Sequence, residues 1–196
     1  GTAREVLRHK TVIQCDMVEI DGMVVEACRK HIPQTACGMD EDPRFQLHIE
    51  DGVKFVKETQ DKYDVIIVDS TEPFGPATPL FNIEFYKDVF GCLSDDGIVV
   101  SQADSVFYNE DIQIKMGQML SECFSKLKFY NFSNLTYPGG LWSFSFASKK
   151  YDAVKDFDSQ RVKDSAMKFK YYTPSLHGAS FELPNFQAER LQKYIK

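Results

Sequence analysis

The amino-acid sequence predicts an α/β fold with a mostly parallel sheet and an antiparallel hairpin towards its carboxyl end. Apolar, strand-like runs alternate with helical patterns through roughly the first 126 residues. Alternation of this kind is typical of right-handed βαβ units, which build a parallel sheet. The pattern then changes, because two strand-like runs are joined by the letters YPGG with no helix between them. The second pattern indicates a hairpin.

The predicted strands are short apolar runs bounded by turn residues. They cover residues 11–20, 45–51, 63–70, 97–104, 127–136 and 141–149. The run from Val65 to Val68 contains only branched apolar residues, so we expect this strand to be buried on both faces. The hairpin predicts an antiparallel strand at the edge of an otherwise parallel sheet.

The predicted helices have apolar residues at helical spacing. They cover residues 2–9, 21–32, 52–60, 82–93, 109–126 and 184–195, and Asn109 is the expected cap of the long helix. We expect residues 1–150 to form one catalytic α/β domain and residues 151–196 to be a helical extension packed on it. Because the chain opens inside a helix, we also expect the first strand of the sheet to lie upstream of residue 1.

The composition is that of a globular domain, and it disfavours several classes of function. With 196 residues, 43% hydrophobic and 27% charged, the chain suits one sizeable domain. The net charge of -6 argues against nucleic acid as a partner. No apolar run approaches the roughly 20 residues that span a bilayer, and we expect a cytoplasmic protein without a membrane partner.

The cysteines and histidines give no indication of a metal site. No two of the five cysteines form a C-x-x-C pair, and the four histidines are scattered. We therefore expect free thiols in a reducing cytoplasm, and no metal.

Three successive predicted strands end in acidic residues. Glu19 and Asp21 close the first, Glu50 and Asp51 the second, and Asp69 the third. Ligands of open α/β sheets sit beyond the carboxyl ends of the strands, where such acids can bind ribose hydroxyls or an adenine amine. Each acid could instead cap the helix that follows it. Three in succession favour a nucleoside site, although they do not separate a methyltransferase from a dehydrogenase or a nucleotide-binding protein.

The segment DSTEPFGPA, residues 69–77, is more specific. Asp69 and Glu72 flank the short turn of Ser70 and Thr71, so both carboxylates can face one cleft, and prolines stiffen the loop that follows. The segment resembles the signature D-S-[ST]-[DE]-P-x-G-P of the spermidine synthase family, the aminopropyltransferases of polyamine biosynthesis.

The resemblance extends along nearly the whole chain. GTAREVL is similar to the end of the family's segment G-G-G-D-G-G-x-x-R-E, and the segments VEID, EDG, LTYPGGLWSFSFASKKYD and KYYTPSLHGASFELPNF follow in the family's order. The segments VDSTEP and GLWSFSFASKKYD resemble those of bacterial members. The resemblance implies a Rossmann-like fold of the type found in class I S-adenosylmethionine-dependent methyltransferases. It also implies that a small β-domain precedes the chain.

The resemblance assigns a group of residues to the nucleoside of decarboxylated S-adenosylmethionine, which is a co-substrate and not a cofactor. Glu19 matches the acid that holds the ribose hydroxyls. Asp51 and Gly52 match the pair that recognises adenine, and Pro76 and Ala77 match residues that wall the same ring.

A second group matches the acceptor amine. Asp69 matches the general base, and Glu72 matches a second acid that binds the amine, often Asp in relatives. Gln102 and Tyr137 match residues that contact the amine or help to activate it. The loop YPGG departs slightly from the family's usual Y-P-[SC]-G.

The resemblance implies transfer of an aminopropyl group to putrescine, which gives spermidine and methylthioadenosine. Because an alkylammonium resembles lysine, with a pKa of about 10.4, its deprotonation at pH 7 costs about 4.6 kcal/mol. A carboxylate at Asp69 can accept that proton as the amine attacks.

Several alternatives stay open. Another amine such as cadaverine, agmatine or spermidine could be the acceptor, or the chain could be a non-catalytic subunit that binds a nucleoside. The family commonly forms dimers or tetramers, so we expect a homodimer or homotetramer.

Overall fold

A computed structural model describes residues 1–71 and 75–196 of the chain. The strands are β1 (Cys15–Glu19), β2 (Phe45–Ile49), β3 (Tyr63–Val68), β4 (Leu93–Ser105), β5 (Lys126–Ser133) and β6 (Leu141–Ser148). The α-helices are α1 (Thr2–Leu7), α2 (Gly22–His31), α3 (Gly52–Glu58), α4 (Ile83–Cys92), α5 (Glu110–Cys123), α6 (Ser159–Asp164), α7 (Pro174–Ser180) and α8 (Asn185–Leu191). Two short 3₁₀ helices cover Pro33–Thr35 and Gly75–Phe81. The predicted order of strands and helices is confirmed.

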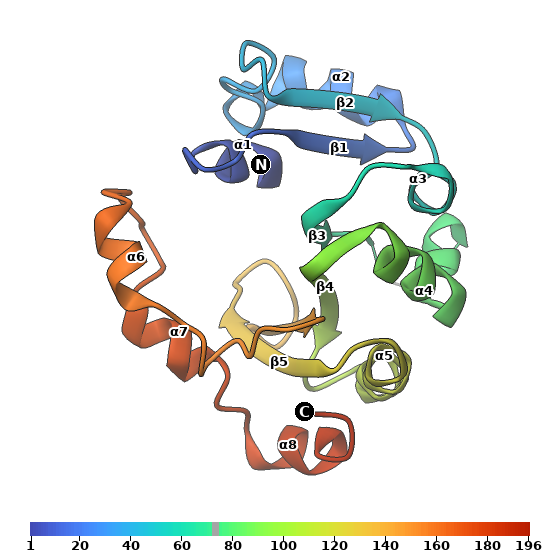
Figure 1. The fold of residues 1–196 in the computed structure, drawn as a ribbon, viewed down its shortest axis with the longest axis vertical. Helices are drawn as coiled ribbons and strands as arrows, with labels where there is room; N and C mark the ends of the chain where they lie inside the picture. The colour runs from blue at the N-terminus through green and yellow to red at the C-terminus, as the bar shows by residue number, and fades with distance from the viewer. Residues whose placement is uncertain (72–74) are drawn as a thin grey trace.

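The strands form a parallel pair, β1–β2, and a four-stranded sheet in the order β3-β4-β6-β5. β3 and β4 run parallel, whereas β6 is antiparallel to both of its neighbours. Figure 1 shows the β1–β2 pair at one end of the molecule and the larger sheet below it. The α/β class and the hairpin are thereby confirmed.

The expected place of the antiparallel strand is wrong. β6 lies between β4 and β5, and the edge strand β5 is parallel to β4. The chain crosses over α5 to the edge of the sheet, and the hairpin then returns β6 into the space between the two parallel strands. A short connecting loop shows that β5 and β6 are neighbours, but it does not show which of them pairs with β4.

The expectation that β3 is buried on both faces is also wrong. Val65 is 52% exposed and Ile67 is 41% exposed, whereas Ile66 and Val68 are partly buried and pack against the core. Side chains alternate between the faces of a strand, so one face of β3 is covered and the other is open. Among the described residues, β3 pairs with β4 alone.

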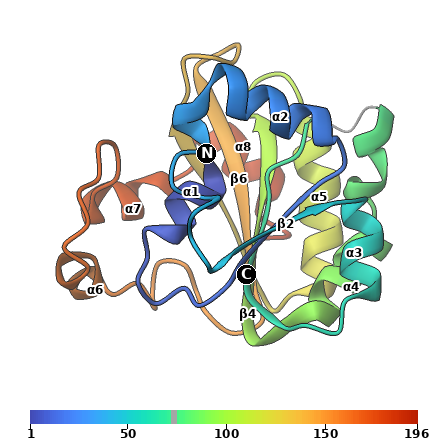
Figure 2. The same cartoon turned by 90° about the horizontal axis from the view of Figure 1, so that it is seen from above.

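The main hydrophobic core lies in the larger sheet and its helices. α4 and α5 pack over one side of it, while α6 and α7 lie on the other side (Figures 1 and 2). Tyr86, Met116, Leu120 and Phe129 are fully or almost fully buried there, and Leu191 of α8 joins them. Lys196 exchanges backbone hydrogen bonds with Leu127 of β5, which fastens the end of the chain to this core.

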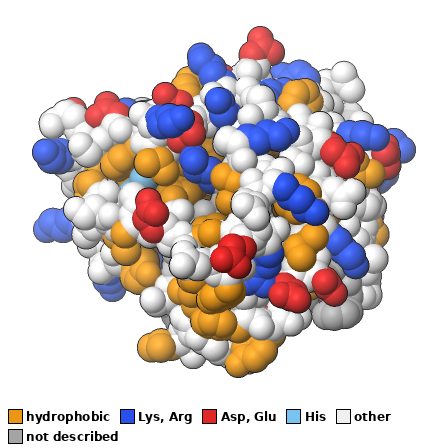
Figure 3. Space-filling model, turned by 90° about the horizontal axis from the view of Figure 1, so that it is seen from below, with side chains coloured by type: hydrophobic (Ala, Val, Ile, Leu, Met, Phe, Trp, Pro, Cys, Tyr) orange, Lys and Arg blue, Asp and Glu red, His pale blue; other side chains and the backbone are white. Residues whose placement is uncertain are grey.

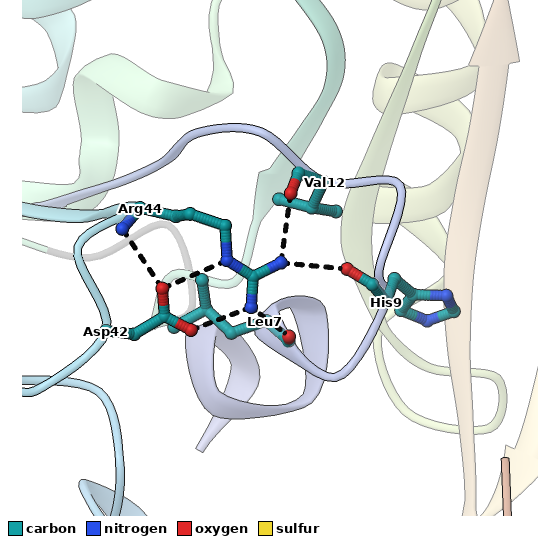
Figure 4. A network of polar contacts seen from close by, with 5 residues as sticks. All are labelled: Leu7, His9, Val12, Asp42 and Arg44. Atoms are coloured by element: carbon teal, nitrogen blue, oxygen red, sulfur yellow. Dashed lines mark hydrogen bonds and ion pairs between the residues drawn. The ribbon is translucent and has the colours of Figure 1, made fainter.

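Arg44, just before β2, holds the end of the first helix and the loop after it. The Arg44 guanidinium donates to the backbone oxygens of Leu7 at 2.6 Å, His9 at 3.0 Å and Val12 at 2.9 Å, and it forms two hydrogen bonds with Asp42 (Figure 4). The planar fork of arginine suits several acceptors at once. Arg44 therefore ties α1 and the loop after it to the start of β2.

Candidate active site

The acids predicted from the sequence lie at the carboxyl ends of the strands. Glu19 ends β1, Asp51 follows β2 and Asp69 follows β3. Val68 pairs with Ser101, so Asp69 and Gln102 come directly after paired residues on neighbouring strands. The sheet topology thus aligns an acid and an amide where an open α/β sheet binds its ligands.

The acids around β1 and β2 bond to the backbone beside them. Glu19 accepts from the backbone N–H of Asp21 at 2.9 Å through Oε1. Asp21 and Asp51 cap α2 and α3, since Oδ1 of each accepts a backbone N–H two residues further on, from Met23 and Val53. The capping role considered for these acids is therefore present in the structure. Gly52, at the first position of α3, is partly buried.

Asp69 lies at the surface and contacts the first helix. Its Oδ2 accepts a hydrogen bond from Oγ1 of Thr2 at 3.1 Å. In the turn that follows, Ser70 Oγ donates to the backbone oxygen of Thr71 at 3.0 Å. Arg44 holds the other end of α1 through the backbone oxygen of Leu7. It therefore also helps to position Thr2, the residue that donates to Asp69.

The loop after Asp69 is described in part. Glu72 lies outside the described residues, and so does the side chain of Pro76. Ala77 is buried within the 3₁₀ helix Gly75–Phe81.

Gln102 is buried and holds the backbone of the residues after it. Its Oε1 accepts from the backbone N–H of Asp104 at 3.0 Å. Asp104 in turn accepts from Nδ2 of Asn109 at 2.8 Å. Asn109 does precede α5, as expected, but its side chain makes no capping hydrogen bond to that helix. The carboxylate of Asp104 binds the amide instead.

Tyr137 lies beside a cavity of about 340 Å³. The cavity is lined by Asp104, Ser105, Tyr108, Asn109, Tyr137, Pro138 and Trp142. The Tyr137 ring is 45% exposed and stacks on Trp142, with 4.2 Å between ring centroids. Of the residues predicted from the sequence, Tyr137 is the one that lines this cavity among the described residues, while Gln102 adjoins it through Asp104.

The charge of Asp69 also affects a partly buried tyrosine. Burial and then the negative charge of Asp69 raise the pKa of Tyr130 to about 12. The Tyr130 ring stacks on Phe144 with 5.6 Å between centroids. Tyr130 therefore stays a neutral phenol at physiological pH.

Two residues of this region were missed by the sequence reasoning. Asp104 is an acid at the end of a strand, the signal that picked out Glu19, Asp51 and Asp69, and it should have been included with them. Trp142 was not among the predicted site residues. It packs on Tyr137 and also lines the cavity.

No helix among the described residues is long and apolar enough to cross a membrane. Within residues 1–71 and 75–196, no group of three or more His, Cys, Asp or Glu side chains could hold a metal ion. On the face drawn in Figure 3, Lys and Arg side chains are interspersed with acids.

Solved structures place the fold in a class. The chain is similar to a spermidine synthase crystallised in complex with the transition-state analogue AdoDATO, with a TM-score of 0.94 and 40% identity over 98% of this chain and 66% of that one. It is also similar to spermidine synthase from Thermotoga maritima, with a TM-score of 0.92 and 39% identity over 98% of this chain and 65% of that one. The chain is thus a Rossmann-like α/β domain of the methyltransferase type.

Sequence relatives define the family. Residues 1–159 match the model of the spermine/spermidine synthase domain. A polyamine aminopropyltransferase from Clostridium perfringens is 46% identical over 98% of this chain and 68% of its own length. Another from Methanocaldococcus jannaschii is 44% identical over the whole chain and 68% of its own length. The chain belongs to the spermine/spermidine synthase family, and it spans about two thirds of the length of these transferases.

Proposed function

We propose that the protein transfers an aminopropyl group from decarboxylated S-adenosylmethionine to putrescine, giving spermidine and methylthioadenosine. The observation that carries the proposal is the alignment of Asp69 with Gln102 at the strand ends of a domain from this family. The names of the relatives support the reaction class, since they are polyamine aminopropyltransferases and spermidine synthases.

The nucleoside is assigned to the ends of β1 and β2. Glu19 would accept hydrogen bonds from the ribose hydroxyls, and it ends a strand in the position typical of a ribose-binding acid. Asp51 would accept from the adenine amine while its Oδ1 caps α3, because a carboxylate has a second oxygen. Gly52 would lie beside the adenine ring, and Pro76 and Ala77 would pack against it.

The chemistry is a displacement at a carbon next to a sulfonium. The amine nitrogen forms a bond to that methylene carbon, the carbon–sulfur bond breaks, and its electron pair returns to sulfur in methylthioadenosine. The proton leaving the attacking nitrogen goes to the carboxylate of Asp69, which acts as the general base. Binding both substrates in one orientation replaces a bimolecular encounter, and this supplies much of the remaining acceleration.

The amine is assigned to the ends of β3 and β4. The turn of Ser70 and Thr71 would shape the approach to Asp69, and Glu72 would attract the cationic amine. Gln102 and Tyr137 would orient it, since Gln102 is fixed by its bond to the Asp104 backbone and Tyr137 faces the cavity. We include in the proposal a cytoplasmic location and a homodimeric or homotetrameric assembly, which fractionation and light scattering would check.

The test is release of methylthioadenosine from decarboxylated S-adenosylmethionine by protein expressed from the complete coding sequence. Putrescine, cadaverine, agmatine and spermidine are compared at equal concentration. The proposal expects the highest kcat/KM with putrescine. A higher value with another amine would change the acceptor, and no release with any of them would leave a nucleoside-binding protein.

A further inference from the structure

Two glutamines are fully buried where α8 packs on α5 and on the hairpin. Gln113 of α5 and Gln187 of α8 have no exposed surface. Nε2 of Gln187 donates to Oε1 of Gln113 at 3.2 Å and to Oγ of Ser143 in β6 at 3.3 Å. Gln187 also forms a reciprocal amide pair with Asn131 of β5. Because a buried amide without partners is costly, these hydrogen bonds hold both side chains in place.

The hydrogen bonds decide which end of the Gln113 amide faces which partner. Its Nε2 donates to the backbone oxygen of Ala103 at 3.0 Å, and a carbonyl oxygen can only accept. Oε1 of Gln113 therefore faces Gln187, which presents its own Nε2. Since the contact with Ala103 sets this order, Gln113 would keep its orientation even without Gln187.

The peptide unit between Ala103 and Asp104 is held at both of its polar groups. It lies in the bulge where the pairing of β4 with β6 is irregular. Its carbonyl accepts from Gln113, and its N–H donates to Oε1 of Gln102 at 3.0 Å. Because a peptide unit is planar, a displacement of the carbonyl also displaces the N–H. The orientation of this peptide therefore couples Gln113 to the side chain of Gln102.

The bulge is a place where the backbone needs such support. Asp104 has a φ of 64°, in the left-handed region that few residues other than glycine adopt, although aspartate and asparagine do so more readily. A conformation of this kind persists where the surrounding contacts hold it. Asn109 donates to the carboxylate of Asp104, and Gln113 donates to the carbonyl just before it. Two side-chain amides thus fix the bulge.

We propose that Gln113 is a positioning residue for the acceptor amine and acts through Gln102. The inference rests on the proposed function, in which Gln102 orients the amine beside Asp69. The C=O and N–H of a trans peptide point in opposite directions, so Gln113 lies on the far side of the peptide from the Gln102 amide. Gln113 therefore acts on the geometry of Gln102 from within the core.

Kinetics of protein expressed from the complete coding sequence test the inference. Gln113→Met keeps the length of the side chain and removes its donor. The KM for putrescine should rise about 3- to 10-fold, the usual effect of losing one hydrogen bond between neutral groups. Gln113→Asn, which keeps the amide but is one methylene shorter, should raise it similarly. A merely structural role would lower the fraction of folded protein, which reduces the apparent kcat and leaves the KM unchanged.

Gln187→Met is the matched control. It removes an equally buried amide but leaves the bond between Gln113 and Ala103, so the KM for putrescine should stay within about twofold of the parent. A double-mutant cycle tests the route: if Gln113 acts through Gln102, the double variant should have the KM of Gln102→Met alone. The inference is overturned if the KM is unchanged in Gln113→Met, if it rises equally in Gln187→Met, or if the two effects in the cycle multiply.

Amide hydrogen exchange separates this inference from the proposed function. The exchange rate of the Asp104 N–H is read by NMR in the parent and the variants. It should be about 3- to 10-fold faster in Gln113→Met and Gln113→Asn, and unchanged in Gln187→Met. That result supports the positioning of Gln102 even if no amine is turned over, which would be a failure of the proposed function alone. An unchanged rate in Gln113→Met overturns the inference even if the protein is an active aminopropyltransferase.

Discussion

The two regions to which we assign the nucleoside and the amine differ in packing. Residues 1–58, which we call the nucleoside half, contain the β1–β2 pair and α1 to α3. Residues 63–149, which we call the amine half, contain the four-stranded sheet with α4 and α5. The described hydrophobic residues buried in the nucleoside half are Leu7, Val25 and Met39, and the members of the main core cluster all follow residue 84.

In the proposed reaction, the residues assigned to the amine therefore belong to the more extensively packed region of the described chain. In the amine half, Gln102 and Asp104 are buried and joined by a hydrogen bond, and reacting groups need such fixed geometry. The nucleoside half is held by strand pairing and the Arg44 network, so a bound nucleoside would stabilise it in turn.

The largest expected effect is on stability. Leu120→Ala removes a fully buried side chain from the core and should lower the free energy of unfolding by about 2–5 kcal/mol. Leu47→Ala, the same change at a half-buried position in β2, should cost about 1 kcal/mol. Urea denaturation of both variants measures the difference. Equal losses would mean that the two halves are packed equally well.

The next effect is on nucleoside binding. Glu19→Gln removes the charge assigned to the ribose hydroxyls, and the Kd for methylthioadenosine should rise about 10- to 100-fold by calorimetry. Glu26→Gln, on the exposed side of α2, is the matched control and should leave the Kd unchanged. If Glu19→Gln binds as the parent does, the nucleoside is not held at the end of β1.

A smaller effect is expected in the loop that carries Tyr137. Gly139 has a φ of 86°, and a Cβ there would lie 2.9 Å from Cδ2 of Phe107. Gly139→Ala should cost about 1–2 kcal/mol of unfolding free energy and raise the KM for the amine, because the loop must shift. Gly91→Ala in α4, where a Cβ meets nothing within 4 Å, should leave the KM near that of the parent and should not lower the unfolding free energy, because alanine favours a helix over glycine. An unchanged KM in Gly139→Ala would separate the loop from amine binding.

The smallest expected effect is a loss of stability at acid pH, and it comes from one ion pair in the nucleoside half. Hydrogen bonds from the Arg44 guanidinium, and then from its backbone N–H, lower the pKa of Asp42 below its usual value. The unfolded chain has the ordinary pKa of about 3.9, so the Asp42–Arg44 pair stabilises fully above that pH. This stabilisation is lost as the pH falls through the lowered pKa of the folded protein.

The stability of Asp42→Asn, measured against pH, tests whether this stabilisation is lost in acid. The difference in urea midpoint between parent and Asp42→Asn should be constant between pH 5 and 8 and should shrink below about pH 4. A difference that grows in acid would contradict the assignment.

The sequence predicted the order of elements because strands and helices differ in hydrophobic period, which is a local property. It also placed Glu19, Asp51 and Asp69 at strand ends, since an acid after an apolar run is visible in the letters. It did not predict the open face of β3, because the Val65–Val68 run does not reveal what covers each side.

The insertion of β6 and the backbone conformation of Asp104 depend on pairing across the sheet. The bulge after Gln102 is a feature of the pairing between β4 and β6. The sequence of residues 97–104 alone therefore does not predict it. Likewise, Asn109 precedes α5 as predicted. Its side-chain amide donates to the carboxylate of Asp104, however, and makes no capping hydrogen bond to the helix. Asp104 and Asn109 line the cavity, and contacts between residues far apart in the sequence decide their conformations.

The most direct test of the whole account measures binding and turnover in Asp69→Asn. The change keeps the shape of the side chain and removes the base from the amine half. The Kd for methylthioadenosine should stay within about twofold of the parent, because the nucleoside half is untouched, while turnover with putrescine should fall about 100- to 10,000-fold. Asp61→Asn, an exposed acid before β3, should change neither. Turnover that survives in Asp69→Asn, or binding that is lost together with turnover, would contradict the division of the site into two halves with Asp69 as its base.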